Sequence, residues 1–183
     1  MSKPKSPSVV TLKHAAAFGY IIHSFAKLEI HMQTVVAGML DTDLATAILL
    51  MGDTNYRQKQ QTVRNIHKTR GIDGHVYPEL EALLDEINEY AGLRNHIAHS
   101  IWISGQRPET IKPMFIKLRG KFPTPVGHWH NEKDYTLSEL RAAANNLNDI
   151  SRKFVKFLDD TGLMARVAAN IEKINDSTHA SPE

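Results

Sequence analysis

The sequence predicts an all-α fold, an antiparallel helical bundle of four to six helices with a small β-hairpin or loop insertion after the third long helix. Long segments place apolar residues at spacings of three and four, the pattern of amphipathic helices. A short alternating segment with glycine and proline precedes the last long helix. A chain of 183 residues is long enough for one domain with its own core. We expect a disordered arm at 1–10, a single helical domain at 11–175 and a flexible tail at 176–183.

The first helix is predicted from about Leu12 to Met39. Its apolar residues form the heptad-like seam of a helix that packs lengthwise in a bundle: Phe18, Ile21, Phe25, Leu28, Met32, Val35 and Met39. Glu29 lies on the flank of this seam. It is either a solvated flank residue or a carboxylate that faces a partner or the active cleft.

Two shorter helices are predicted next. The segment 41–43 offers caps for a buried apolar helix over 44–51, which ends at Gly52. A second helix over 55–70 ends at Gly71. It is basic and lacks acids, and three of its cations share one stripe by helical spacing: Arg57, Arg64 and Lys68. This stripe is either a solvated face or a surface that binds RNA phosphates.

The next long helix is predicted from about Tyr77 to His99, with its acids in the first turns and its cations in the last. That order complements the helix dipole, so part of the charge pattern has a purely structural explanation. Two short strands should follow, at 101–103 and at 111–118, the second interrupted by Pro113. We expect a loop over 120–133, which contains Pro123, Pro125 and His128-Trp129-His130.

The last long helix opens with a capping box, Thr136 to Glu139, and should end near Asp160, with Gly162 as its C-cap. A short helix over 163–174 can follow it. We find neither repeats nor low-complexity segments.

The composition excludes several classes of protein. Without cysteine, the chain has no disulfide, no thiolate nucleophile and no cysteine-ligated zinc. No apolar run is long enough to span a bilayer, and the first residues lack the apolar core of a signal peptide. We therefore expect a cytoplasmic protein without a membrane partner. The net charge of +2 is too small to indicate nucleic-acid binding by itself.

We expect neither a metal nor another cofactor. The histidine pairs 128/130 and 23/31 lack the carboxylate or third ligand that zinc spacing requires. Neither a glycine-rich phosphate loop nor a nucleophilic serine motif is present. Trp129 either anchors its loop or stacks on a base.

The stretch that carries the most chemistry is the helix end from Arg94 to His99, where a cation, an amide and two imidazoles occupy six positions. At about 100° per residue, Asn95 and His99 share a face, so Asn95 can hydrogen-bond His99 and orient its ring. Arg94 and His99 are five residues apart and diverge on a straight helix. Either the helix tightens before His99, or the two side chains converge on a groove shared with another subunit.

Arg94, the polar Asn95 beside it and His99 after three further residues resemble the signature of the HEPN superfamily. Its members are small four-helix-bundle proteins, many of them metal-independent ribonucleases. The resemblance implies a homodimer through the motif helices, with RNA as substrate and 2′,3′-cyclic phosphate products. Similar proteins often act as toxins, in antiphage defence or in RNA processing, so an antitoxin or regulatory protein is a possible partner.

The roles follow from the chemistry of RNA cleavage. A proton must leave the 2′-hydroxyl, another must reach the 5′-oxygen, and charge must be stabilised at phosphorus. We expect His99 to transfer a proton, Arg94 to bind the phosphate and Asn95 to orient His99, with His96 and Glu29 as secondary candidates.

Three interpretations stay open at this point. The first is a HEPN-type endoribonuclease. The second is a non-catalytic HEPN-like module that binds RNA or a protein. The third is a bundle with other duties, in which Arg94 and His99 cap a helix and pair with acids.

Overall fold

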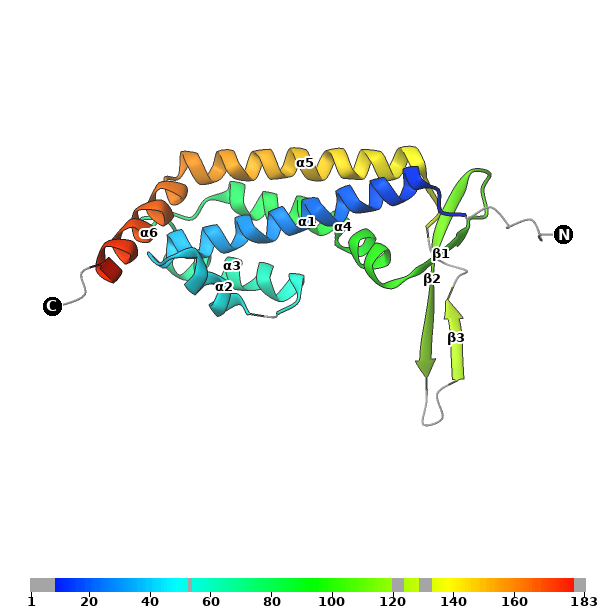
Figure 1. Ribbon diagram of the computed structural model, residues 1–183, viewed down its shortest axis with the longest axis horizontal. Coiled ribbons are helices and arrows are strands. Elements are labelled where there is room, and N and C mark those ends of the chain that lie inside the picture. Colours follow the sequence, from blue (N-terminus) through cyan, green and yellow to red (C-terminus); the bar gives the residue numbers. More distant parts are fainter. Residues whose placement is uncertain (1–8, 53, 120–123, 129–132, 180–183) are drawn as a thin grey trace. The chain divides into compact units, whose positions relative to one another are not determined.

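A computed structural model describes residues 9–52, 54–119, 124–128 and 133–179 and confirms the predicted fold class (Figure 1). The described chain is mostly helical, with a small antiparallel sheet inserted between α4 and α5. Its elements, in chain order, are α1 (Leu12–Met39), α2 (Leu44–Met51), α3 (Tyr56–Arg70), α4 (Pro78–His99), β1 (Ile101–Ser104), β2 (Thr110–Arg119), β3 (Thr124–His128), β4 (Tyr135–Thr136), α5 (Leu137–Asp160) and α6 (Leu163–His179).

The chain divides into two compact units. Unit 1 consists of Met1–Ser24 and Glu89–Leu147, and unit 2 of Phe25–Asn88 and Asn148–Glu183. The helices α1, α4 and α5 each contribute one part to each unit. Most of the expected N-terminal arm lies outside the described residues, and α6 extends to His179, past the expected start of a tail at 176.

Unit 2 contains the larger apolar core. Four residues of the seam predicted for the first helix are buried here, Phe25 at 1% exposure and Leu28, Met32 and Val35 at 0%. The side chains that pack in this core from the other helices include Val63, Leu80, Leu84, Ile87, Phe154 and Leu158. Each large apolar side chain buried in this way contributes about 1.5–3 kcal/mol. The three- and four-residue spacing in the sequence therefore marks the core of the molecule.

Helix ends follow the capping residues in the sequence. Asp43 accepts a hydrogen bond from the Thr46 amide at 2.9 Å at the start of α2. A capping box formed by Asn55 and Gln58 opens α3. The predicted capping box of α5 is also present, because the Thr136 amide donates to Glu139 at 2.7 Å and the Glu139 amide donates to the Thr136 hydroxyl at 3.1 Å.

The sheet belongs to unit 1 and is built around β2. This strand pairs antiparallel with β1, from Ile101↔Met114 to Ser104↔Ile111, and with β4 at its start. Contrary to the prediction, Pro113 does not interrupt this strand. On the edge of β2 that faces β3 and β4, Pro113 lies between the residues that pair with β4 and those that pair with β3. Its missing N–H therefore removes no hydrogen bond to either of these two strands.

The prediction of a loop over 120–133 is wrong for β3, which pairs with β2 from Phe115↔His128 to Arg119↔Thr124. The prolines in this stretch suggested a loop, but β3 is an edge strand, where a proline such as Pro125 is tolerated. Trp129 and His130 lie outside the described residues.

Among the described residues, no single helix is both long and apolar enough to cross a membrane. The pair α1 and α2, which bends by 111°, meets that test by length and composition alone.

Candidate functional site

The predicted motif lies on the last two turns of α4, within unit 1. These turns stay α-helical, because the amide of Ser100 donates to the carbonyl of His96 at 3.0 Å, the i to i−4 pattern. The helix therefore does not tighten before His99. At about 100° per residue, Arg94 and His99 leave α4 about 140° apart. Of the two arrangements that the sequence allowed, a helix that tightens before His99 is therefore not present.

Arg94 has no carboxylate partner in the part of the chain that the structure describes. Its Nη1 donates to Asn95 Oδ1 at 3.3 Å, and its Nε is buried without a hydrogen-bond partner. The interpretation in which Arg94 pairs with an acid to hold a helix end is therefore not supported by the described contacts. A guanidinium without a counterion can bind an anionic ligand.

The predicted hydrogen bond between Asn95 and His99 is not formed within the described chain. The Asn95 amide oxygen instead accepts from Arg94, a charged donor on the neighbouring residue. A charged donor forms the stronger bond to an amide oxygen, which explains this choice. Asn95 therefore contacts Arg94 and not the ring of His99, which it was predicted to orient.

His99 is the last residue of α4 and is exposed. The exposed residues around it carry no carboxylate and no lysine: Gly92, Asn95, Ala98 and Ile101, the last at 62% exposure. Arg94, whose Nη1 donates to Asn95, is the fixed charge beside these residues.

The corner between α4 and β1 holds two further buried donors without a partner, Ser100 Oγ and Trp102 Nε1. The Trp102 ring packs against Phe18 at 4.7 Å and against Tyr135 at 5.8 Å, between ring centroids. Buried polar groups normally have a hydrogen-bond partner. Arg94 Nε, on the last turns of α4, is a third buried donor without a partner.

His96 precedes His99 by three residues, which places the two side chains about 60° apart around α4. It lines a cleft of about 430 Å³ together with Tyr90, Lys133, Tyr135 and Glu139. The Lys133 ammonium lies over the Tyr135 ring, 5.1 Å from its centroid. His96 thus lines this cleft, whereas His99 is exposed at the end of the helix.

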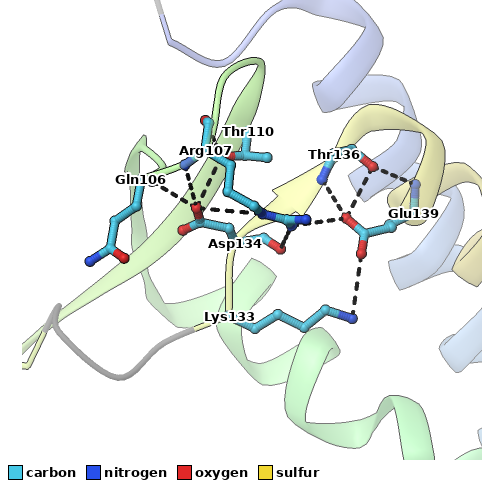
Figure 2. Close-up of polar contacts among 7 residues, drawn as sticks. All are labelled: Gln106, Arg107, Thr110, Lys133, Asp134, Thr136 and Glu139. Carbon is cyan, nitrogen blue, oxygen red and sulfur yellow. Dashed lines mark hydrogen bonds and ion pairs between the residues drawn. The ribbon is translucent and has the colours of Figure 1, made fainter.

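A network around two carboxylates fixes the turn between β1 and β2 to the start of α5 (Figure 2). Asp134 Oδ2 accepts from the amides of Gln106 at 2.7 Å and Arg107 at 2.9 Å, and from the Thr110 hydroxyl at 3.1 Å. The hydrogen bond from the Arg107 amide is the largest cause that holds the pKa of Asp134 below its usual value. Sequence reasoning missed this network, since its partners are up to 28 residues apart.

The remaining candidates lie in unit 2. Arg64 donates to Glu81 and, at 2.7 Å, to Asp85, both on the first half of α4. Glu29 accepts from Lys59 at 2.8 Å, which gives this carboxylate a structural partner. Arg57 and Lys68 are exposed, and neither is in an ion pair with a described residue.

No group of three histidine, aspartate or glutamate side chains that could hold a metal ion occurs among the described residues. The two histidines of the α1 pair differ, because His23 is exposed while His31 Nε2 lies 3.0 Å from the Ser151 hydroxyl. Comparisons of the chain with protein-family models, with curated proteins and with solved structures found no match.

Proposed function

We propose that the chain is a metal-independent endoribonuclease of HEPN type, in which the α4 ends of two copies form one catalytic groove. One observation carries this proposal. Arg94 is a partly buried cation without a carboxylate partner among the described residues, on the same helix end as the exposed His99.

The two side chains supply what RNA cleavage needs. The guanidinium of Arg94 stays charged and can donate two parallel hydrogen bonds to the oxygens of a phosphate. The imidazole of His99 can take the proton of the 2′-hydroxyl or give one to the leaving 5′-oxygen. The ribose provides the nucleophile, so neither a metal ion nor a covalent intermediate with the protein is needed. The products carry 2′,3′-cyclic phosphate and 5′-hydroxyl ends.

The geometry of α4 favours sites shared between copies. Since Arg94 and His99 diverge on one helix, the Arg94 of one copy meets the His99 of its partner in this arrangement. The exposed residues Gly92, Asn95 and Ala98 are small or neutral, which allows the two helices to approach each other. This homodimer forms part of the proposal.

The test is an RNA cleavage assay on the purified protein in the presence of a chelator. His99→Ala should reduce the rate by about 10²–10⁴-fold, the usual contribution of a positioned acid or base. Arg94→Ala should reduce it by about 10²–10³-fold, the effect of losing one donor to the charge of the transition state. His23→Ala is the matched control, because His23 is an exposed histidine of the same unit outside the motif. Product ends are analysed for cyclic phosphate.

A mixing experiment tests the shared groove. In a dimer of Arg94→Ala with His99→Ala, one of the two sites keeps both intact side chains if each site draws on both copies. Equal mixing should then restore about a quarter of the parent activity, because about half of the dimers are mixed. No restoration would place both side chains in one copy.

Absence of cleavage, with both variants folded and dimeric like the parent, would contradict the ribonuclease and favour the non-catalytic module. Equal cleavage by parent and variants would identify a contaminant.

A further inference from the structure

We propose that unit 1 holds a second binding site, a cleft between the N-termini of α1 and α5 that binds the phosphate group of a nucleotide-sized phosphomonoester. This site does not depend on the proposed ribonuclease, and neither Arg94 nor His99 lines it.

The cleft has a volume of about 910 Å³. Its walls are the start of α1, the turn between β1 and β2, and the start of α5, represented by Thr11, Lys13, His14, Arg107, Thr110 and Ser138. The volume lies at the upper end of the range of small-molecule sites, about 300–1,000 Å³. Inorganic phosphate alone would leave most of it empty, and Val9, Ile111 and Leu137 give it apolar surface for an organic group.

His14 is the observation that points to a ligand. It lines the cleft and is only 8% exposed. The amide of Thr11 donates to His14 Nδ1 at 3.2 Å, and the Thr11 hydroxyl lies 2.9 Å from the same nitrogen. An Nδ1 that accepts from an amide carries no proton, so the proton of the neutral ring is on Nε2. That buried Nε2–H has no hydrogen-bond partner. It is a donor that lacks an acceptor, which a phosphate oxygen would supply.

The charges around the cleft favour an anion. Two helices, of 28 and 24 residues, begin here, and the N-terminus of a helix carries partial positive charge and amide donors. Lys13 and Arg107 are cations among the lining residues, and Glu109 is the one carboxylate among them. Arg107 already pairs with two carboxylates, Asp134 (Nε to Oδ2, 3.9 Å) and Glu139 (Nη2 to Oε2, 3.7 Å), so the positive charge for a ligand comes from Lys13 and the helix N-termini. Lys13 is exposed and is not in an ion pair with a described residue, so its ammonium is available to a ligand.

The far wall of the cleft is already ordered. Asp134 holds the amides of Gln106 and Arg107, and the Arg107 guanidinium donates to the Asp134 carbonyl at 2.9 Å (Figure 2). Gly105 allows this close packing, because a Cβ there would lie 2.1 Å from Thr110 Oγ1. A preformed wall means that binding does not have to order the loop, which removes one cost of association.

The experiment compares two substitutions of His14. In His14→Asn, the side-chain oxygen can replace Nδ1 as the acceptor for Thr11, but the donor at Nε2 is lost. In His14→Gln, the amide nitrogen reaches the position of Nε2 and keeps a donor. His23→Asn is the matched control on the exposed side of the same helix. Circular dichroism and thermal unfolding verify that each variant is folded.

Binding of adenosine 5′-monophosphate is measured by calorimetry, with adenosine and inorganic phosphate as separate probes. We expect the monophosphate to bind the parent and the His23→Asn protein alike, and adenosine to bind far more weakly. His14→Asn should weaken binding about 10- to 100-fold, the loss typical of one hydrogen bond to a charged group, and His14→Gln less. A short single-stranded RNA without terminal phosphate is the last probe. If this RNA binds His14→Asn more weakly than the parent, and the monophosphate shows no such difference, the phosphate bound at this site belongs to an RNA backbone.

Two results would overturn the site. One is that neither the monophosphate nor the RNA binds the parent at millimolar concentration. The other is that they bind His14→Asn as tightly as the parent. Both outcomes are independent of the cleavage assay, so failure of this site and failure of the ribonuclease are distinguishable.

Discussion

Two arginines of this chain show how differently the structure treats residues that look alike in sequence. Arg64 in unit 2 donates to Glu81 and Asp85, and its side chain is 18% exposed. Arg94 in unit 1 has no described carboxylate partner and contacts the neutral amide of Asn95. The sequence predicted that Arg94 binds phosphate, and for Arg64 it left a solvated face or a phosphate contact open. The comparison suggests a rule: the arginine that can bind a phosphate is the one that no carboxylate of the described chain pairs with.

The charge order along α4 explains the difference. The acids of its first half lie beside the basic helix α3 within unit 2 and neutralise part of it. The cations of its second half belong to unit 1, where no acid of the described chain pairs with Arg94. The charge order that complements the helix dipole therefore also separates a structural cation from a candidate catalytic one.

The largest expected effect comes from replacing each of the two arginines with alanine and measuring the cleavage rate. Arg94→Ala should reduce the rate by about 10²–10³-fold, the effect of losing one donor to the charge of the transition state. Arg64→Ala should leave the rate within about threefold of the parent, because its guanidinium is engaged by carboxylates. Rates are compared under single-turnover conditions on one RNA. Equal losses in both variants would remove the distinction between the two arginines.

For the free energy of unfolding we expect the opposite order, a larger effect from Arg64→Ala than from Arg94→Ala. Arg64→Ala should lower the free energy of unfolding by about 1–2 kcal/mol, since it leaves the partly buried Glu81 without its charged partner. Asp85 is 71% exposed and adds little. Arg94→Ala should change stability by less than about 0.5 kcal/mol. Urea unfolding with an unchanged m-value gives both numbers. A larger loss for Arg94→Ala would show that its role is structural.

A third prediction concerns pH and belongs to unit 2. Burial lowers the pKa of His67 below its ordinary value of 6.5, against an opposing effect of Glu81, and Lys68 lowers it further. Below pH 6.5 the unfolded chain binds a proton that folded His67 does not, so stability should fall as the pH falls. The slope is at most about 1.4 kcal/mol per pH unit for this group.

His67→Gln tests the assignment of this slope. Its side-chain oxygen can still accept from the Tyr77 amide, which donates to His67 Nε2 at 2.9 Å, but it does not titrate. Urea unfolding at pH 7.5 and 5.5 should show a shallower decline for this variant. An unchanged decline would assign the acid sensitivity to other groups.

The fold was predictable because its helices carry strong local signals. Apolar periodicity located α1 and α4, and capping residues such as Asp43 and Thr136 located helix starts. The strand β3 was not predictable, because its prolines favour a loop and its pairing with β2 depends on residues elsewhere in the chain. Local chemistry thus determined the helices, while pairing at longer range determined the sheet.

The candidate site was predictable in position but not in detail. The spacing of Arg94 and His99 located it at a helix end, and the structure places both there. The sequence could not show that Asn95 would bond to Arg94, or that Arg64 would meet two acids from another helix. The burial of His14 beside a cleft also depends on residues more than 90 positions away, and Thr11 three residues before it was the one local signal.

The smallest expected effect concerns the same comparison, between paired and unpaired cations, within the single helix α3. Arg57, Arg64 and Lys68 share a stripe by spacing, yet Arg64 alone of the three is paired with described carboxylates. In a cleavage-deficient His99→Ala background, Arg57→Ala and Lys68→Ala should each weaken RNA binding about two- to fivefold. Each should reduce the slope of log K against log salt by about one, because one phosphate contact is lost.

Arg64→Ala should change neither the affinity nor the slope in that background, because its charge is already matched within the fold. Fluorescence anisotropy over a series of salt concentrations measures both quantities. If Arg64→Ala reduced the slope as much as Arg57→Ala, its ion pairs with α4 would have to open when RNA binds. Pairing in the free protein would then be a poor guide to which cations bind phosphate, and the unpaired state of Arg94 would lose its weight as evidence for the catalytic groove.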